Sequence, residues 1–200
     1  GRPSRAPSWL TGWRDDRGRT HLVVDEPAAL VWAVDAGALA WSPSAARVEA
    51  PDRPTYAVVE VDGPDWAEVL TVARLCRTAL DHLGLTAGPQ VTGRGGVQVW
   101  VPVRHGPTAE QVRAWVDRLA GVVGQVLPDV ALAPRSAAPL APYAPVVRPG
   151  APVSMPVDWD ELDDLRPDAF TIRDVRRRLG EHGDPFVRLL LVDQVLPPLT

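Results

Sequence analysis

Valine-rich strands that alternate with amphipathic helices constrain the fold of this chain more than any other feature. Residues 56–62 and 97–103 predict strands, and every odd-numbered position of the second is Val. Between them, apolar residues at helical spacing over 69–83 predict a helix that Asp65 caps. A second amphipathic helix is predicted to begin after Thr108. This alternation indicates an α/β or α+β fold, a mixed sheet flanked by helices.

The segments outside this central pattern are less regular. Residues 1–20, rich in Arg, Pro, Gly and Trp, predict an irregular N-terminal arm. Residues 128–152 carry seven prolines and predict an extended connection. We expect residues 1–200 to form a single domain, which at this length buries a sizeable core. Shorter elements are predicted as a strand at 21–24 and as helices at 27–34, 158–165, 171–179 and 186–196.

The composition excludes several classes of protein. The single cysteine, Cys76, excludes a disulfide framework and is predicted to be a core residue. No apolar stretch approaches the ~20 residues of a membrane span, and no charged-then-apolar leader opens the chain, so we expect a cytoplasmic protein without a membrane partner. All 21 basic residues are Arg, which excludes chemistry on a Lys amine. The net charge of −4 argues against non-specific coating of nucleic acid, although a local Arg patch can bind it.

Two carboxylates stand at the end of the first predicted strand. Side chains alternate along a strand, so Glu60 and Asp62 share one face. Such a pair suits Mg²⁺ or Mn²⁺, and nucleotidyl transfer uses a pair of this kind with a third acid to hold two metals. The alternative is a strand end whose acids simply face water.

A glycine-rich turn at residues 92–96 leads into the second predicted strand. Successive backbone amides in such a turn can cradle a phosphate, and Arg94 can add a charge-assisted contact. A tight β-turn without a ligand is the alternative. No Gly-Lys-Ser/Thr sequence follows, which excludes a Walker loop.

Several collinear segments together resemble the primase-polymerase domain of bacterial ligase D, a branch of the archaeo-eukaryotic primase superfamily. The central ones are VVEVDGP at 58–64, after PDRP at 51–54, and TGRGGVQVWVP at 92–102. The resemblance covers nearly the whole chain and implies the primase-polymerase fold. The remaining matching segments are 24–32, 141–143, 148–157, 159–162, 170–173 and 183–186.

In this family an Asp-x-Asp pair and a later Asp bind two metal ions. The resemblance places Glu60 and Asp62 at the pair, with Glu in place of the first Asp. Asp129 stands at a distance that suits the third acid. The alternative reads Asp129 as part of an earlier family turn, in which case the segment with the third acid is deleted. Mn²⁺ or Mg²⁺ is therefore expected only if some activity is left.

The family's phosphate-binding positions are changed as well. Its Lys in the glycine-rich turn falls on Gly95, its His on the following strand falls on Gln98, and an Arg near the end falls on Val146. Without these three charge-assisted bonds, nucleotide affinity would fall by ~5 kcal/mol or more. The residues left for phosphate binding are Thr92, Gly93, Arg94, Gln98 and Arg148.

The resemblance also implies that the chain begins inside the family domain, whose N-terminal part contacts the DNA end. The arm is then left for that role, with Trp13 and Arg14 as candidate DNA contacts.

Three functions are consistent with the sequence. The expected one is a non-catalytic relative of the ligase D domain, with no intact catalytic residues and no required cofactor. It would act in DNA end-joining repair by binding DNA ends, a nucleotide or a repair partner. The first alternative is a residual Mn²⁺-dependent, DNA-directed nucleotidyltransferase. The second is a structural protein-interaction module.

Overall fold

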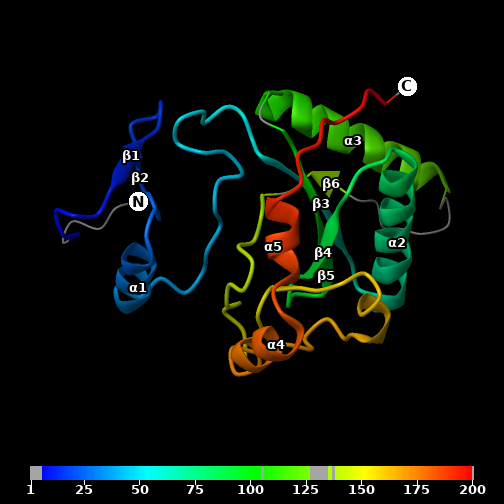
Figure 1. Cartoon of the computed structure of the whole chain (residues 1–200). Coiled ribbons are helices and arrows are strands. Elements are labelled where there is room, and N and C mark those ends of the chain that lie inside the picture. Colours follow the sequence, from blue (N-terminus) through cyan, green and yellow to red (C-terminus); the bar gives the residue numbers. More distant parts are fainter. Residues whose placement is uncertain (1–5, 105, 127–134, 137, 200) are drawn as a thin grey trace. The chain divides into compact units, whose positions relative to one another are not determined.

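The computed structural model describes residues 6–104, 106–126, 135–136 and 138–199, with only the backbone described at 135–136 (Figure 1). The chain forms two compact units, which divide after Leu39. We call residues 1–39 the N-terminal unit and residues 40–200 the main unit, and describe each by itself.

A β-hairpin followed by a short helix makes up the N-terminal unit. Strands β1 (Gly12–Arg14) and β2 (Thr20–Leu22) pair antiparallel, and α1 (Pro27–Asp35) begins with Pro at its first position. The prediction of an irregular arm is therefore wrong over Gly12–Arg14. The hairpin forms because the Asp15 carboxylate accepts hydrogen bonds from the backbone amides of residues 17 and 19.

His21 completes this turn from the second strand. Its Nε2 lies 3.0 Å from Oδ2 of Asp15, and Arg19 Nε lies 2.9 Å from the same oxygen. The hydrogen bond with His21 is the main cause that holds the pKa of Asp15 well below its usual range.

The main unit is built on a five-stranded sheet in the order β6-β3-β5-β4-β7, and all the described neighbours pair antiparallel. This agrees with the predicted fold class. The central pair, β3 with β5, runs in register over seven residues on each side. The strands are β3 (Tyr56–Asp62), β4 (Gly88–Val91), β5 (Gly96–Pro102), β6 (Arg135–Ser136) and β7 (Met155–Pro156).

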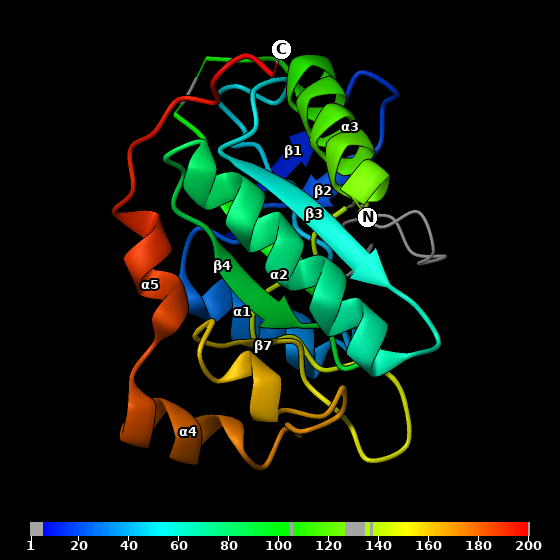
Figure 2. The same ribbon diagram turned by 90° about the vertical axis from the view of Figure 1, so that its right-hand side faces the viewer.

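Two long helices cover one face of this sheet. Helices α2 (Trp66–His82) and α3 (Ala109–Val126) lie against the same face (Figure 2). The odd-numbered valines of β3 and β5 point into this layer and are buried, as the alternation predicts. Cys76 is fully buried there, and burial raises the pKa of its thiol to about 12.

The sequence also predicts where these helices begin. The side chain of Asp65 accepts hydrogen bonds from the amides of residues 67 and 68, so it caps α2. At α3, Thr108 and Gln111 exchange backbone-to-side-chain hydrogen bonds, which is the complete capping box.

The C-terminal helices are shorter or shifted relative to the predictions. The predicted 158–165 helix is only a 3-10 turn, η1 (Leu162–Asp164). Helix α4 (Val175–His182) passes through Gly180, where the sequence predicted its end, and stops at Gly183, whose φ is 73°. Helix α5 (Pro185–Leu190) replaces the longer helix predicted over 186–196.

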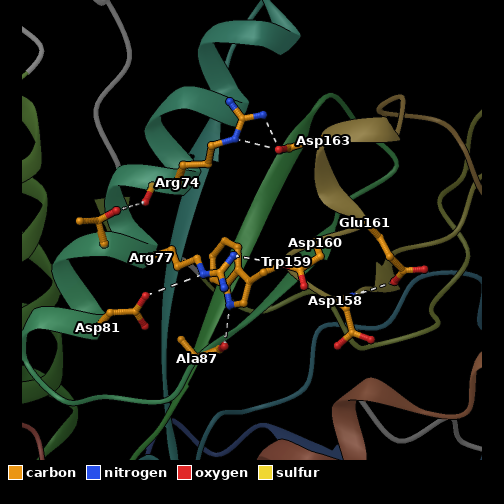
Figure 3. Close-up of polar contacts among 10 residues, drawn as sticks. Arg74, Arg77, Asp81, Ala87, Asp158, Trp159, Asp160, Glu161 and Asp163 are labelled. Carbon is orange, nitrogen blue, oxygen red and sulfur yellow. Dashed lines mark hydrogen bonds and ion pairs between the residues drawn. The ribbon is translucent and has the colours of Figure 1, made fainter.

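The η1 segment is attached to α2 by charged and aromatic contacts (Figure 3). Arg74 pairs with Asp163, and the Arg77 guanidinium carbon lies 5.4 Å from the centre of the Trp159 ring. The indole Nε1 of Trp159 donates to the carbonyl of Ala87 at 2.8 Å. These contacts hold residues 158–164 against α2, where the sequence predicts a continuous helix.

Among the described residues, no helix is long and apolar enough to cross a membrane.

Gly96 sets the closest approach between the two central strands. A Cβ at this position would lie 2.7 Å from the carbonyl oxygen of Val61 and 2.8 Å from Oδ1 of Asp62. We expect Gly96→Ala to lower the free energy of unfolding by about 1–3 kcal/mol, because backbone has to shift. Urea unfolding followed by circular dichroism measures this change.

The control is Gly121→Ala, inside α3, where a Cβ meets nothing within 4 Å. It should raise stability by about 0.5–1 kcal/mol. Equal stability changes for the two variants would contradict the close approach at Gly96.

Candidate functional site

A row of polar side chains crosses the face of the sheet opposite α2 and α3. The register places Glu60 of β3 beside Gln98 of β5, and Gln98 beside Gln90 of β4. Gln90 and Gln98 are 0% and 1% exposed. Buried amides need hydrogen-bond partners, so the segment that covers this row decides what the row can do.

The chain's own backbone covers the two glutamines. Gln98 accepts from the Leu140 amide at 3.1 Å, and its Nε2 lies 3.4 Å from the Ala138 carbonyl oxygen. Gln90 donates to the carbonyl of Leu140 at 3.1 Å. We call residues 138–140 the crossover segment, because it leads from β6, beside β3, toward β7, beside β4. Within the described residues, Oε1 of Gln90 has no hydrogen-bond partner.

The two predicted carboxylates lie at the end of β3, as the alternation predicts. Glu60 is half-buried in the polar row, and Asp62 is exposed beside Gly96. Both make further interactions, so neither is a free ligand group. Asp129, the candidate third acid, lies outside the described residues.

In the part of the chain that the structure describes, no three Asp, Glu, His or Cys side chains are placed to hold a metal ion. A two-metal site needs more carboxylates than β3 supplies. Of the three predicted acids, the described residues include only Glu60 and Asp62, and we derive no catalytic step through a metal.

The predicted glycine-rich turn connects β4 to β5. The Thr92 hydroxyl donates to the carbonyl of Gly96 at 2.9 Å and accepts from the amides of Gly96 and Arg94, each at 3.2 Å. Gly93 and Gly95 have φ of 68° and 113°, which favour glycine. The Thr92 hydroxyl therefore stabilises the turn through hydrogen bonds to the turn's own backbone. This arrangement is typical of a tight β-turn.

Two of the predicted phosphate contacts meet at this turn. Arg148 donates from Nη1 to the Arg94 carbonyl at 3.2 Å, and both side chains are exposed. Val146, in the position of a family Arg, is 6% exposed, and its Cγ2 would lie 3.4 Å from a Cβ on Gly93. Val146 thus packs beneath the turn at Gly93.

The candidate DNA contacts Trp13 and Arg14 belong to β1 of the N-terminal unit. The Trp13 ring lies 5.8 Å from the His21 ring, and Arg14 Nε donates to the Gly18 carbonyl at 3.1 Å. Both stabilise the hairpin, in a segment that the sequence predicted to be an irregular arm.

Sequence reasoning missed the role of Gln90. Its strand, β4, reads Gly-Pro-Gln-Val and has no alternating apolar pattern that would predict a strand. Gln98 was predicted as a vestigial nucleotide contact, whereas its amide binds the crossover segment.

Comparison with known proteins identifies similar sequences. A family model described as LigD, primase-polymerase domain, matches residues 2–139 and 129–186. The multifunctional non-homologous end joining protein LigD of Pseudomonas aeruginosa is 32% identical over 186 residues, covering 80% of this chain and 22% of that protein. The bifunctional non-homologous end joining protein LigD of Bacillus subtilis is 23% identical over 208 residues, covering 92% and 34%. The chain thus spans about a third or less of these relatives' length.

A solved structure supports the same fold. The polymerase domain from Mycobacterium tuberculosis ligase D in complex with DNA aligns with a TM-score of 0.78 at 23% identity. The alignment covers 94% of this chain and 76% of that one.

We expect Gln98→Leu to lower the free energy of unfolding by about 1–3 kcal/mol, because it leaves the Leu140 amide buried without its acceptor. The exposed Gln125→Leu on α3 is the control and should stay within about 0.5 kcal/mol. Chemical unfolding of both variants tests this. A Gln98→Leu protein as stable as its control would show that the crossover segment does not depend on this amide.

Proposed function

The chain belongs to the LigD primase-polymerase domain family, and we propose that it is a non-catalytic member that binds DNA ends in non-homologous end joining. The observation that carries this proposal is that the Gln98 side chain is hydrogen-bonded to the backbone of the crossover segment. Where the family places a His, this chain has an amide that is buried and bonded on both sides to its own backbone. A side chain held in this way is not available to a nucleotide phosphate.

Two further changes support the loss of nucleotide chemistry. Gly95, at the position of the family's Lys, carries no cation, and Val146, at the position of an Arg, is buried. Glu for Asp at residue 60 lengthens one carboxylate arm by a methylene.

Binding to DNA is supported by what is left at the surface. Arg94 and Arg148 meet at the glycine-rich turn, and Arg side chains suit phosphate because they form paired hydrogen bonds with it. The similar polymerase domain from M. tuberculosis was solved in complex with DNA.

The second candidate is a residual Mn²⁺-dependent nucleotidyltransferase. Glu60 and Asp62 favour it, since they keep two carboxylates at the end of β3. A structural interaction module is the outcome if no nucleic acid binds.

DNA binding is tested by fluorescence anisotropy with a 5′-phosphorylated duplex that has a 3′ overhang, at about 50 and about 200 mM salt. We expect binding that weakens with salt, with a Kd on the order of 10⁻⁶ M or tighter at low salt, because released counterions drive the association. Absence of binding at the lower salt concentration would sink the DNA-binding proposal and favour the interaction module.

Catalysis is tested separately by primer extension with Mn²⁺ and ribonucleotides. We expect no product from the wild-type chain, because the buried Gln98 amide is bonded to the chain's own backbone and Gly95 carries no cation for a nucleotide phosphate. Template-dependent addition that disappears in Asp62→Ala would instead establish the residual nucleotidyltransferase.

A further inference from the structure

Four arginines gather where three separate segments of the main unit meet. They are Arg94 on the glycine-rich turn, Arg148 on a later loop, Arg173 just before α4 and Arg176 in the first turn of α4. We infer that this arginine surface is where the chain holds the sugar-phosphate backbone of a DNA end. The inference rests on the proposed function and adds Arg173 and Arg176 to the two arginines, Arg94 and Arg148, that meet at the glycine-rich turn.

Hydrogen bonds to the backbone fix the three segments side by side. The Arg148 guanidinium bonds to the Arg94 carbonyl, which joins the loop to the turn. The Ile172 amide donates to the carbonyl of Ala151 at 3.1 Å, which joins the segment before α4 to the same loop. In Figure 1 the turn between β4 and β5, the loop and α4 lie at the same end of the main unit.

Arg173 and Arg176 are spaced so that both side chains can lie on the same side of α4. Arg173 and Arg176 are three residues apart across the start of α4, a separation of about one helical turn. Both side chains are exposed. The two arginines that follow are already used: Arg177 pairs with Glu181, and Arg178 is buried against Glu161.

No acid of the described residues pairs with the arginine surface. Within the described residues, none of its four guanidinium groups forms an ion pair. The nearest acid along the chain, Asp174, is occupied by the amide and hydroxyl of Thr171 and by Arg177. Most other described arginines of the main unit are paired with an acid, namely Arg53, Arg74, Arg77, Arg104, Arg166, Arg177, Arg178 and Arg188.

This distribution of charge favours a polyanion as the partner. Exposed ion pairs neutralise most basic side chains, and the whole chain carries a net charge of −4. Attraction to phosphates is therefore concentrated where cations lack partners. Arg side chains on hydrogen-bonded segments can contact several phosphates of one DNA strand, and such contacts position a protein on DNA.

The test compares two triple variants with the same change in charge. Arg94→Gln/Arg173→Gln/Arg176→Gln alters the arginine surface and keeps the bond from Arg148 to the backbone of residue 94. The matched control is Arg47→Gln/Arg113→Gln/Arg118→Gln, which removes three exposed arginines from other parts of the main unit. Among the described residues these three have no acidic partner either. Thermal unfolding of both variants checks that they fold.

Binding of the 5′-phosphorylated overhang duplex is measured by anisotropy from about 50 to about 200 mM salt. For the surface variant at low salt, we expect Kd to rise by on the order of tenfold for each arginine that binds a phosphate in the wild-type chain. The slope of log K against log salt should become shallower by about 0.9 for each of these arginines. The control should keep the wild-type slope within about 1.

An equal weakening of binding in the two variants, or a surface variant that binds as tightly as the wild-type chain, would overturn the inference and leave the proposed function standing. A wild-type chain that does not bind the duplex would instead overturn the proposed function, and the inference with it.

Discussion

The pairing of β3 with β5 is the constraint on which the rest of the main unit depends. Seven residues on each strand pair in register, with Val59 opposite Val99 and Glu60 opposite Gln98. A slip of one residue would turn the valines away from α2 and α3 and bury the polar side chains in their place. Gly96 lets this pairing continue to the end of β3, because it has no side chain to meet the Val61 carbonyl. The register of β3 and β5 therefore determines both the apolar core beneath α2 and α3 and the polar row on the opposite face.

On the face of the sheet opposite α2 and α3, the buried polar side chains are covered by the chain's own crossover segment. Where a polymerase would need side chains free to contact phosphate and metal, Gln90 and Gln98 bind the backbone of the crossover segment. Buried amides are costly to leave unpaired, so this arrangement stabilises the fold while it occupies both side-chain amides. The exposed cations have the opposite character, since they contribute little to stability and are available to a partner. We therefore place the proposed binding role at the turn and α4 rather than on the sheet.

Local patterns predict some elements well and others poorly for physical reasons. The helices α2 and α3 and the strands β3 and β5 carry complete patterns of apolar spacing and caps, and the structure confirms them. The hairpin β1–β2 depends on a few hydrogen bonds to Asp15, which no periodicity predicts. The 158–165 segment has helical residues, but its contacts with Arg74 and Arg77 hold all but one turn of it in an irregular path. Tertiary contacts override weak local preference in such short segments.

Residue types and their spacing along single segments were enough to establish the fold class, the family resemblance and the shared face of Glu60 and Asp62. What the side chains of Gln98, Arg94 and Arg148 contact could be known only from the folded chain. The partners of Gln98 come from residues some forty positions away. Arg148 bonds to the carbonyl of Arg94, and Ile172, next to Arg173, bonds to the carbonyl of Ala151. Such contacts are set by how the sheet and its connections pack, which is a property of the whole chain and not of any one motif.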